Sequence, residues 1–398
     1  MVKIEPFAVE QWMDKYEITP GVLNIAETCA ASVSIDDLGT LSKKKDTANP
    51  VNLSTKLTYG AIRGSEKLRG LVAALFDSET AEPLSTDKVL ITQGAIVANF
   101  LLLYTLIGPG DHVVCVYPTY QQLYGVPQSL GAKVSLWNLK RDHGYVPDVA
   151  ELKSLVKSNT KMIILNNPNN PTGATIPEAT LSSIVDFARA RDIIILSDEV
   201  YRPLYHSLPY DTDVPPSILS FGYDKTISTG SMSKAWALAG IRLGWIASRD
   251  KGIIEAVAAA RDYTTISVSQ LDDQVASYAL SEAVRPALIM RNLELAKTNL
   301  ALLGKFVEGH QGVCSWVKPT AGTTAFVQFT NGGKPVDDVA FCLDVLDKTK
   351  VMLVPGSKCF GHEQDFKGYV RIGYVSETDV LVESLEKLGE YVNKNLSS

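Results

Sequence analysis

The chain has few cysteines, and they follow no pairing pattern. Neither a disulfide framework nor a zinc site is indicated, because no Cys-x-x-Cys pair occurs among the 398 residues and the number of cysteines is odd. The five histidines show no paired spacing either, so we expect no metal site. Such cysteine usage is typical of a reducing compartment, and we expect the protein in the cytoplasm. The cysteines are Cys29, Cys115, Cys314, Cys342 and Cys359.

Excess positive charge and long apolar runs are also missing. The net charge of −6 argues against a non-specific nucleic-acid binder and against binding to an anionic membrane. No run is long and apolar enough to span a bilayer, and the first residues lack the apolar stretch of a signal peptide. The hydrophobic content of 45% and charged content of 21% are those of a globular protein with room for one large and one smaller domain.

Apolar runs alternate with helical patterns between about residues 85 and 250. The runs at 89–92, 112–116, 133–137, 162–165 and 193–196 predict strands. Two of them are unbroken, as expected for strands covered on both faces. Strands that alternate with helices predict an α/β fold with a mostly parallel sheet and right-handed crossovers.

The pattern changes after residue 250. Helical periods near 252–262, 269–283 and 286–308 are followed by short strands at 315–317, 324–329, 351–354 and 368–372, with two helices among them. This indicates a small α+β domain. We predict an N-terminal segment (1–45) packed on that small domain (291–398), and a large domain over 46–290.

Lys234 lies in the most informative segment of the chain, residues 231–245. Ser231 and Ser233 can donate hydrogen bonds to a phosphate, and Arg242 can bind one with two N–H groups. We expect Arg242 to open a buried strand over 241–247. A lone lysine in a serine-rich turn is usually a surface residue, so its interpretation depends on the other motifs.

One helix start and one turn each follow a strand, where they can meet an anionic or an aromatic ligand. Ligands of parallel sheets bind beyond the carboxyl ends of the strands. Gly94 opens a helix after the first strand, and the N–H groups of Ala95 and Ile96 at that helix start would attract an anion. Tyr120 follows the next strand and could offer a flat face to an aromatic ligand, with Tyr124 as the competing residue.

Two further strand ends carry polar side chains. Asp198 ends an apolar strand, where a carboxylate needs a partner such as a protonated pyridine nitrogen. Tyr201 lies three residues later and could reach the same ring. Asn170, in a turn rich in Asn, Pro and Gly, could donate a hydrogen bond to a phenolate oxygen.

These motifs stand together in one order that resembles a known family. The chain is similar to fold type I pyridoxal-phosphate (PLP) enzymes of the class I/II aminotransferase family from about residue 55 to 375. The resemblance implies an enzyme that moves an amino group between an α-amino acid and a 2-oxo acid, with PLP as cofactor. It also implies a homodimer with shared sites and a mostly parallel, seven-stranded sheet flanked by helices, plus the smaller α+β domain. The matching motifs are Tyr59-Gly, Gly64-Ser-Glu-Lys-Leu-Arg, Thr92-Gln-Gly-Ala, Pro118-Thr-Tyr, Asn167-Pro-Asn-Asn-Pro-Thr-Gly, Ser197-Asp-Glu-Val-Tyr, Ser231-Met-Ser-Lys, Gly240-Ile-Arg-Leu-Gly-Trp, Val354-Pro-Gly-Ser and Val370-Arg-Ile.

The resemblance implies roles in catalysis and cofactor binding. Lys234 would form the internal aldimine and shuttle the proton. We expect cationic and apolar surroundings to lower the pKa of the amine once an amino acid has freed it from the cofactor. Asp198 would keep the pyridine nitrogen protonated, and Tyr201 would tune the aldimine as the third catalytic residue. Tyr120 would stack on the ring. The other cofactor-binding residues implied are Gly94, Ala95, Ile96, Ser231, Ser233 and Arg242 at the phosphate, Asn170 and Tyr201 at the 3′-oxygen, and Tyr59 reaching the phosphate of the neighbouring subunit.

Substrate binding is implied for Arg371, Asn170 and Glu27. Arg371 would hold the substrate α-carboxylate in a two-pronged fork. Glu27 could bind an amine on the substrate or act as a second acid–base group, and the plainer interpretation is a solvent-exposed or ion-paired glutamate without a part in catalysis. No second arginine for a dicarboxylate substrate is evident, which favours a neutral, aromatic or amine-bearing amino acid.

Alternatives to transamination stay open. The segment around Glu27 resembles that of relatives such as 1-aminocyclopropane-1-carboxylate synthase and capreomycidine synthase, which implies γ- or β-elimination, replacement or ring closure. A non-catalytic binding module is disfavoured by the intact lysine and aspartate. A nucleotide-binding oxidoreductase is disfavoured because no Gly-x-Gly-x-x-Gly follows a strand.

Overall fold

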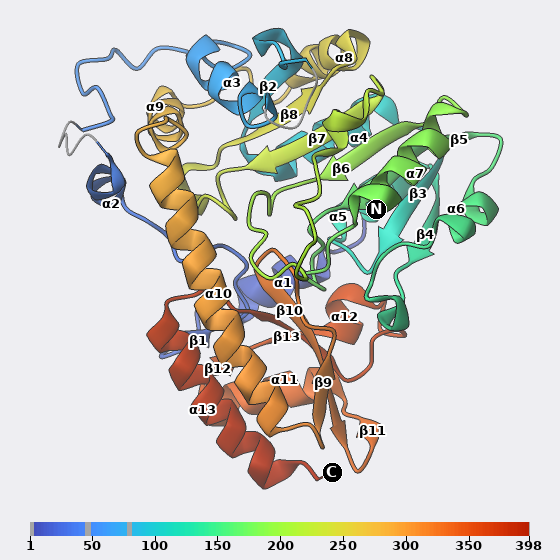
Figure 1. The fold of residues 1–398 in the computed structure, drawn as a ribbon, viewed down its shortest axis with the longest axis vertical. Coiled ribbons are helices and arrows are strands. Elements are labelled where there is room, and N and C mark those ends of the chain that lie inside the picture. The colour runs from blue at the N-terminus through green and yellow to red at the C-terminus, as the bar shows by residue number, and fades with distance from the viewer. Residues whose placement is uncertain (1–3, 44–48, 78–81, 398) are drawn as a thin grey trace.

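A seven-stranded sheet forms the centre of the larger part of the molecule (Figure 1). The structure is a computed structural model that describes residues 4–43, 49–77 and 82–397. The strand order is β2-β8-β7-β6-β5-β3-β4, and only β8 runs antiparallel to its neighbours. This confirms the predicted α/β fold with a mostly parallel sheet. The strands are β2 (Val89–Thr92), β3 (His112–Tyr117), β4 (Lys133–Asn138), β5 (Thr160–Asn166), β6 (Ile194–Asp198), β7 (Thr226–Ser231) and β8 (Gly244–Ser248).

The two faces of this sheet belong to two separate apolar clusters. In β5, Ile163 and Leu165 pack into one cluster, whereas Met162 and Ile164 pack into the other. Alternate side chains of a strand point to opposite faces, so an unbroken apolar run is what a doubly covered strand requires. The helices of this part are α3 (Glu66–Ala73), α4 (Gly94–Leu106), α5 (Gln122–Ser129), α6 (Val149–Leu155), α7 (Glu178–Arg189), α8 (Lys251–Arg261) and α9 (Gln270–Ala279).

The C-terminal part is smaller and mixes strands with helices. Its main sheet has the order β11-β10-β14-β13, with β9 paired to β10. The long helix α10 (Arg285–Gly309) connects the two parts and packs along α13 (Figure 1). The other elements are β9 (Cys314–Trp316), β10 (Thr324–Asn331), β11 (Lys334–Pro335), α11 (Asp338–Thr349), β12 (Val351–Met352), β13 (Val354–Pro355), α12 (Gly356–Phe360), β14 (Tyr369–Gly373) and α13 (Thr378–Asn395).

Two sequence-based expectations need correction. The strand expected at 351–354 is two strands in different sheets, because β12 pairs with β1 whereas β13 pairs with β14. The strand expected over 241–247 begins only at Gly244. Arg242 precedes it with φ 51° at the end of the short 3-10 turn Ala239–Ile241, so its backbone cannot join the ladder there.

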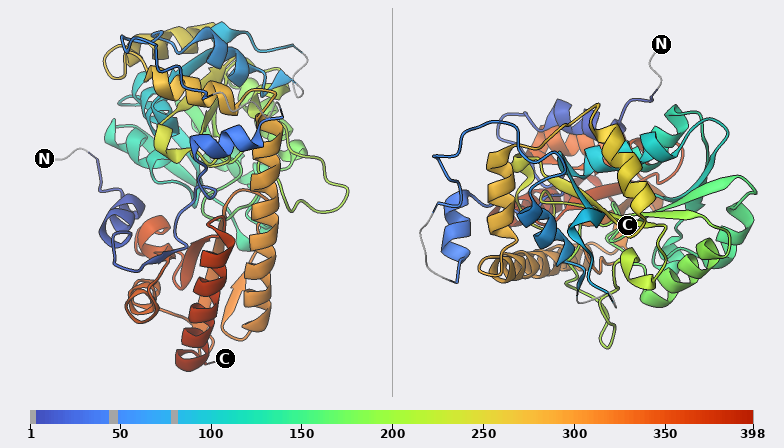
Figure 2. Two further views of the ribbon diagram at one scale, coloured as in Figure 1. Left: turned by 90° about the vertical axis from the view of Figure 1, so that its left-hand side faces the viewer. Right: turned by 90° about the horizontal axis from the view of Figure 1, so that it is seen from above.

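Only the first part of the N-terminal segment packs on the C-terminal part, because Leu38 of α2 (Ile35–Leu41) belongs to the apolar cluster of the larger part. The segment also contains α1 (Ala8–Tyr16) and β1 (Leu23–Asn24). The Trp12 indole N–H donates to the Leu353 carbonyl at 2.9 Å, and α1 lies beside α12 (Figure 2). The predicted boundary at residues 45 and 46 falls outside the described residues, and the one at 290 lies inside α10. Among the described helices, none has the length and apolarity that crossing a membrane requires.

Candidate active site

The carboxyl ends of the parallel strands open into one cavity of about 550 Å³. Asn166, Asp198 and Ser231 are the last residues of β5, β6 and β7, and each of them lines it. Parallel strands bring their carboxyl ends to the same edge of a sheet, which is why motifs far apart in the sequence meet here. The site residues predicted from the sequence that line this cavity are Glu27, Ala95, Ile96, Tyr120, Asn170, Asp198, Tyr201, Ser231, Ser233, Lys234, Arg242 and Arg371.

Asp198 is a buried carboxylate with a fixed neighbour. The side-chain amide nitrogen of Asn99 donates a hydrogen bond to Oδ2 of Asp198 at 2.8 Å. Thr229 donates in turn to the Asn99 oxygen at 2.8 Å, which fixes the orientation of the amide. Burial raises the pKa of Asp198 to about 6, against the opposing effect of the Asn99 hydrogen bond. A positively charged partner in the cavity would therefore stabilise the ionised form.

One end of the cavity is built to receive an anion. Ala95 and Ile96 lie in the first turn of α4, where N–H groups have no partner within the helix. Gly94 has φ +79°, and a Cβ at this position would lie 2.9 Å from Nη2 of Arg242. A Cβ on Gly244 would lie 2.6 Å from the Ala95 nitrogen. The two glycines thus allow an arginine and a helix start to meet in one place.

The hydroxyl groups of two serines lie beside this helix start. Ser231 accepts a hydrogen bond from the Ser233 backbone at 3.2 Å, and both side chains line the cavity. Arg242 donates to the Ala239 carbonyl at 2.9 Å and lies 3.5 Å from the Ser233 hydroxyl. Two hydroxyl groups, a guanidinium and a helix start are the donor set expected of a phosphate site.

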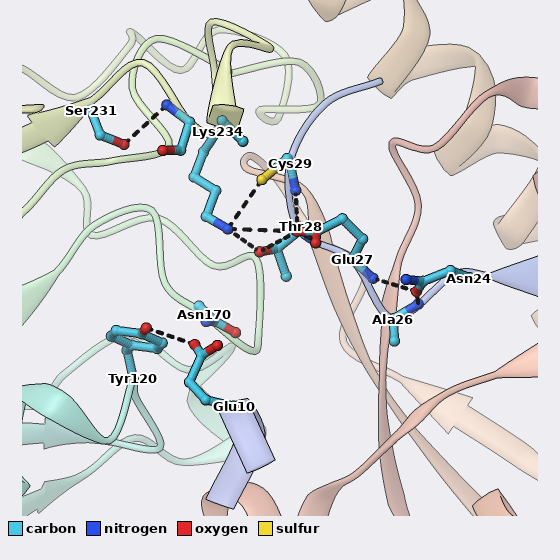
Figure 3. A network of polar contacts seen from close by, with 12 residues as sticks. Glu10, Asn24, Ala26, Glu27, Thr28, Cys29, Tyr120, Asn170, Ser231 and Lys234 are labelled. Atoms are coloured by element: carbon cyan, nitrogen blue, oxygen red, sulfur yellow. Dashed lines mark hydrogen bonds and ion pairs between the residues drawn. The ribbon is translucent and has the colours of Figure 1, made fainter. Parts of the chain in front are cut away.

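Lys234 contacts the N-terminal segment across the cavity (Figure 3). Its Nζ donates to the Thr28 hydroxyl at 2.6 Å and lies 3.4 Å from the sulfur of Cys29. Oε1 of Glu27 lies 3.7 Å from the same nitrogen. Burial favours the neutral amine, but Cys29, Glu27 and Tyr201 together raise the pKa of Lys234 above its ordinary value. The lowered pKa expected of the amine that a substrate frees from the cofactor stays a prediction. In the cofactor-free protein, Glu27, Cys29 and Tyr201 rather than cations surround the nitrogen.

Glu27 is held as a carboxylate by its own loop. The backbone N–H groups of Thr28 and Cys29 donate to Oε1 at 2.5 and 3.0 Å. Burial acts against the charge, but Lys234 and these N–H groups lower the pKa of Glu27 to about 2. The same neighbourhood raises the pKa of the Cys29 thiol to about 11, mainly through burial. Glu27 is therefore a fixed negative charge beside Lys234.

Arg371 presents an unsatisfied donor from β14. The side chain is 3% exposed, and its Nε has no hydrogen-bond partner among the described residues. Nη2 donates to the Ala26 carbonyl at 2.8 Å, and Nη1 lies 3.4 Å from Oδ1 of Asn170. A buried guanidinium with an unused N–H fits an incoming carboxylate.

The aromatic residues predicted for the site divide into two groups. Tyr120 and Tyr201 line the cavity, whereas Tyr124 packs against Tyr117 and His362. Tyr59 is 77% exposed and does not line the cavity of its own chain. Its predicted contact with a neighbouring subunit stays a prediction.

Several cavity residues were not identified from the sequence. Asn99 had a signal, since it is a lone amide in the apolar helix 96–107. Glu10 had none, because its place depends on the packing of α1, where it accepts a hydrogen bond from the Tyr120 hydroxyl at 2.8 Å. The same holds for Asp14 and Glu17, which also line the cavity.

The cavity fits PLP in three respects. A phosphate would meet the donors around Gly94 and Arg242, and a protonated ring nitrogen would meet Asp198. Lys234 supplies the amine and lines the same cavity. An anion site and a buried carboxylate joined by one cavity match a cofactor that carries a phosphate and a basic ring nitrogen.

Comparison with known proteins gives the same class. A solved PLP-dependent aminotransferase from Streptococcus suis 89-1591 is 37% identical, with a TM-score of 0.88 and coverage of 100% of both chains. Capreomycidine synthase of Streptomyces vinaceus is 30% identical over 83% of this chain and 80% of that protein. Aspartate aminotransferase of Thermotoga maritima is 29% identical over 85% of this chain and 84% of that protein.

The fold and the site define a PLP-dependent enzyme of fold type I, as the sequence predicted. The family described as aminotransferase class I and II matches residues 40–387. The chain belongs to that family, and pyridoxal phosphate is its cofactor.

Proposed function

We propose that the enzyme transfers the amino group of an α-amino acid to a 2-oxo acid. The observation that carries the proposal is the meeting of Lys234, Asp198 and Arg371 in one cavity. These three groups suit an amine that moves a proton, a carboxylate that faces a ring nitrogen, and a guanidinium that binds a carboxylate. In the reaction, one molecule gains the amino group and hydrogen that the other loses, in exchange for a carbonyl oxygen.

Lys234, Asp198 and Arg371 each have a separate role in the reaction. Bound PLP supplies an electron sink that makes the α-proton of an amino acid acidic. Lys234 takes that proton on Nζ and returns it, and Asp198 holds a proton on the ring nitrogen. Arg371 orients the substrate through its α-carboxylate, so that the α-proton faces Nζ.

The remaining polar residues position the cofactor. Tyr120 would pack against one face of the ring, and Asn170 and Tyr201 would donate to its 3′-oxygen. The N–H groups of Ala95 and Ile96, the hydroxyls of Ser231 and Ser233, and Arg242 would hold the phosphate. This set is supported by the joint lining of one cavity.

A half-reaction tests transamination. The enzyme loaded with PLP is mixed with a panel of single amino acids in the absence of any 2-oxo acid, and the released 2-oxo acid is quantified. Transamination yields one 2-oxo acid for each bound cofactor and then stops. Continued consumption of the amino acid without an acceptor contradicts the proposal, because elimination or ring closure regenerates the cofactor in each cycle.

Ring closure or elimination is the second candidate. It is favoured by the carboxylate of Glu27 beside Lys234 and by the relative named capreomycidine synthase. The low pKa of Glu27, about 2, makes it a weak base as long as Lys234 is charged, so an anchoring role for Glu27 suits the geometry better than acid–base catalysis.

We also propose a cytoplasmic homodimer. Tyr59 is 77% exposed in a segment that also exposes Leu53, Leu57 and Ile62, which suits a subunit interface. All five cysteines are free thiols, which suits a reducing compartment. Light scattering of the purified enzyme at several concentrations tests the dimer, and a monomer at micromolar concentration contradicts it.

A further inference from the structure

One wall of the active-site cavity is acidic. Glu10, Asp14 and Glu17 follow each other at helical spacing in and just after α1, and all three line the cavity together with Glu27. We call these four residues the acidic wall. Glu10 reaches from α1 toward Tyr120 and Asn170, and Glu27 lies beside Lys234 (Figure 3). Glu10 and Glu27 therefore face the place where chemistry occurs.

The negative charge of the acidic wall is balanced by few positively charged side chains. Among the described residues, the ion pairs include Glu27 with Lys234 but none of Glu10, Asp14 and Glu17. Lys234 is also the amine that the cofactor requires, so it does not offset the charges of Glu10, Asp14 and Glu17. An additional positive charge in the cavity would then be stabilised by the whole wall.

The cationic residues of the cavity have other tasks. Arg242 lies at the helix start that suits a phosphate, and Lys234 is the amine. Arg371 is nine-tenths buried, with an unpartnered Nε, and points independently to a ligand that carries a carboxylate. A substrate held there by its carboxylate leaves its side chain to the rest of the cavity, where the acidic wall lies.

A metal ion does not suit the wall. No group of three or more His, Cys, Asp or Glu side chains in the described part of the chain is close enough together to hold one. The carboxylates are spread along a helix and a loop, which suits an extended organic cation with several N–H donors. A guanidinium or ammonium group on a flexible chain has this form.

We propose that the substrate of this enzyme is an α-amino acid with a cationic side chain, whose ammonium or guanidinium group binds the acidic wall. The proposal rests on the proposed transamination and names its substrate class. Glu27 and Glu10 are specificity-determining residues in it, and Asp14 and Glu17 add to the negative potential at the entrance. Acidic amino acids are repelled by the same charges.

Pairs of substrates that match in shape test the proposal. The PLP-loaded enzyme is assayed with arginine and citrulline, which differ in the charge of the side-chain end, and with ornithine and glutamate. We expect kcat/KM to be at least about tenfold higher for arginine than for citrulline, since several exposed charge contacts each contribute a few-fold. Raising the ionic strength should reduce this ratio.

Two sets of variants locate the effect. The first set combines Glu10→Gln, Asp14→Asn and Glu17→Gln. In this variant kcat/KM for arginine should exceed that for citrulline by no more than about threefold, because KM for arginine rises. The matched control combines Glu383→Gln, Glu386→Gln and Glu390→Gln, which removes the same charge from exposed positions of α13 outside the cavity. The control should keep the ratio of the parent enzyme.

The outcomes separate this inference from the proposed function. Activity on arginine and ornithine with loss of preference only in the α1 variant supports both. Transamination of citrulline or glutamate at the same or higher efficiency than arginine overturns the inference and leaves the proposed function standing. An equal fall of the ratio in both triple variants also overturns it, since a general effect of net charge would then explain the preference. Absence of transamination with every amino acid of the panel overturns the proposed function itself.

Discussion

The two sides of the active-site cavity differ in burial, in origin and in charge. The cofactor side comes from strand ends and the start of α4, and its central groups Asp198 and Ser231 are each 3% exposed. The substrate side comes from α1 and the loop at residues 24–30, and Glu10, Asp14 and Glu17 are solvent-exposed there. Buried groups with fixed partners suit the chemistry that a family shares, whereas exposed groups on a peripheral helix can change at low cost to folding. The cofactor side therefore determines the type of reaction, and the substrate side determines which substrate is used.

The largest expected effect comes from the cofactor side. Lys234→Ala removes the amine that moves the proton, so turnover should fall by at least about 10³-fold, as for general acid–base residues. Lys225→Ala removes an exposed lysine that pairs with Asp192 on the surface and serves as control. Steady-state rates and the absorbance of bound PLP measure both variants. Retained turnover in Lys234→Ala would contradict the assigned role.

Asp198→Asn should lower kcat by about 10²- to 10⁴-fold, because the amide cannot hold a proton on the ring nitrogen. The same change should stabilise the protein without PLP. Burial raises the pKa of Asp198 to about 6, so the carboxylate contributes stability only at low pH and loses it as the pH rises through about 6. The variant should gain on the order of 1–3 kcal/mol at pH 7 and little at pH 4.

Urea unfolding of the cofactor-free proteins at both pH values measures this gain. Asp192→Asn, at an exposed carboxylate, is the control and should change stability little at either pH. A destabilised Asp198→Asn at pH 7 would show that the buried charge is already compensated. In that case the ionised Asp198 would not destabilise the fold.

Arg371→Lys tests the point where the two sides meet. The lysine keeps the charge but loses the planar fork, so kcat/KM for amino acids should fall by about 10- to 100-fold, mostly through KM. The absorbance of bound PLP should stay unchanged, since Arg371 faces the substrate. A lost cofactor signal with an unchanged KM would place this arginine on the cofactor side instead.

The smallest effect is a shift in pH dependence. Glu27 raises the pKa of Lys234, so Glu27→Gln should lower that pKa. The cofactor-free variant should then incorporate PLP at lower pH than the parent protein, because more of the amine is neutral there. The rate of incorporation from pH 6 to 9, followed by absorbance, measures the shift. An unchanged profile would mean that Glu27 has no electrostatic influence on the amine.

The sequence predicted the cofactor side more completely than the substrate side. Asp198 and Gly94 each follow an apolar run, and strand ends can be read from a local pattern. Ser231 ends the largely polar strand β7, and it was identified through the motif around Lys234 instead. Glu10 lies more than a hundred residues from its partner Tyr120, and nothing local indicates that α1 packs over the cavity. The raised pKa of Lys234 in the cofactor-free protein could not be predicted for the same reason, since its neighbours Glu27 and Cys29 come from a distant segment.

Transfer of a labelled amino group tests the central claim most directly. The PLP-loaded enzyme is incubated with an amino acid labelled with nitrogen-15 and with an unlabelled 2-oxo acid of different side chain, and the products are analysed by mass spectrometry. The account predicts a new amino acid that carries the label, formed in equal amount to the 2-oxo acid derived from the donor, and none with Lys234→Ala. Consumption of the donor with its nitrogen retained in a ring or released as ammonia would contradict the account.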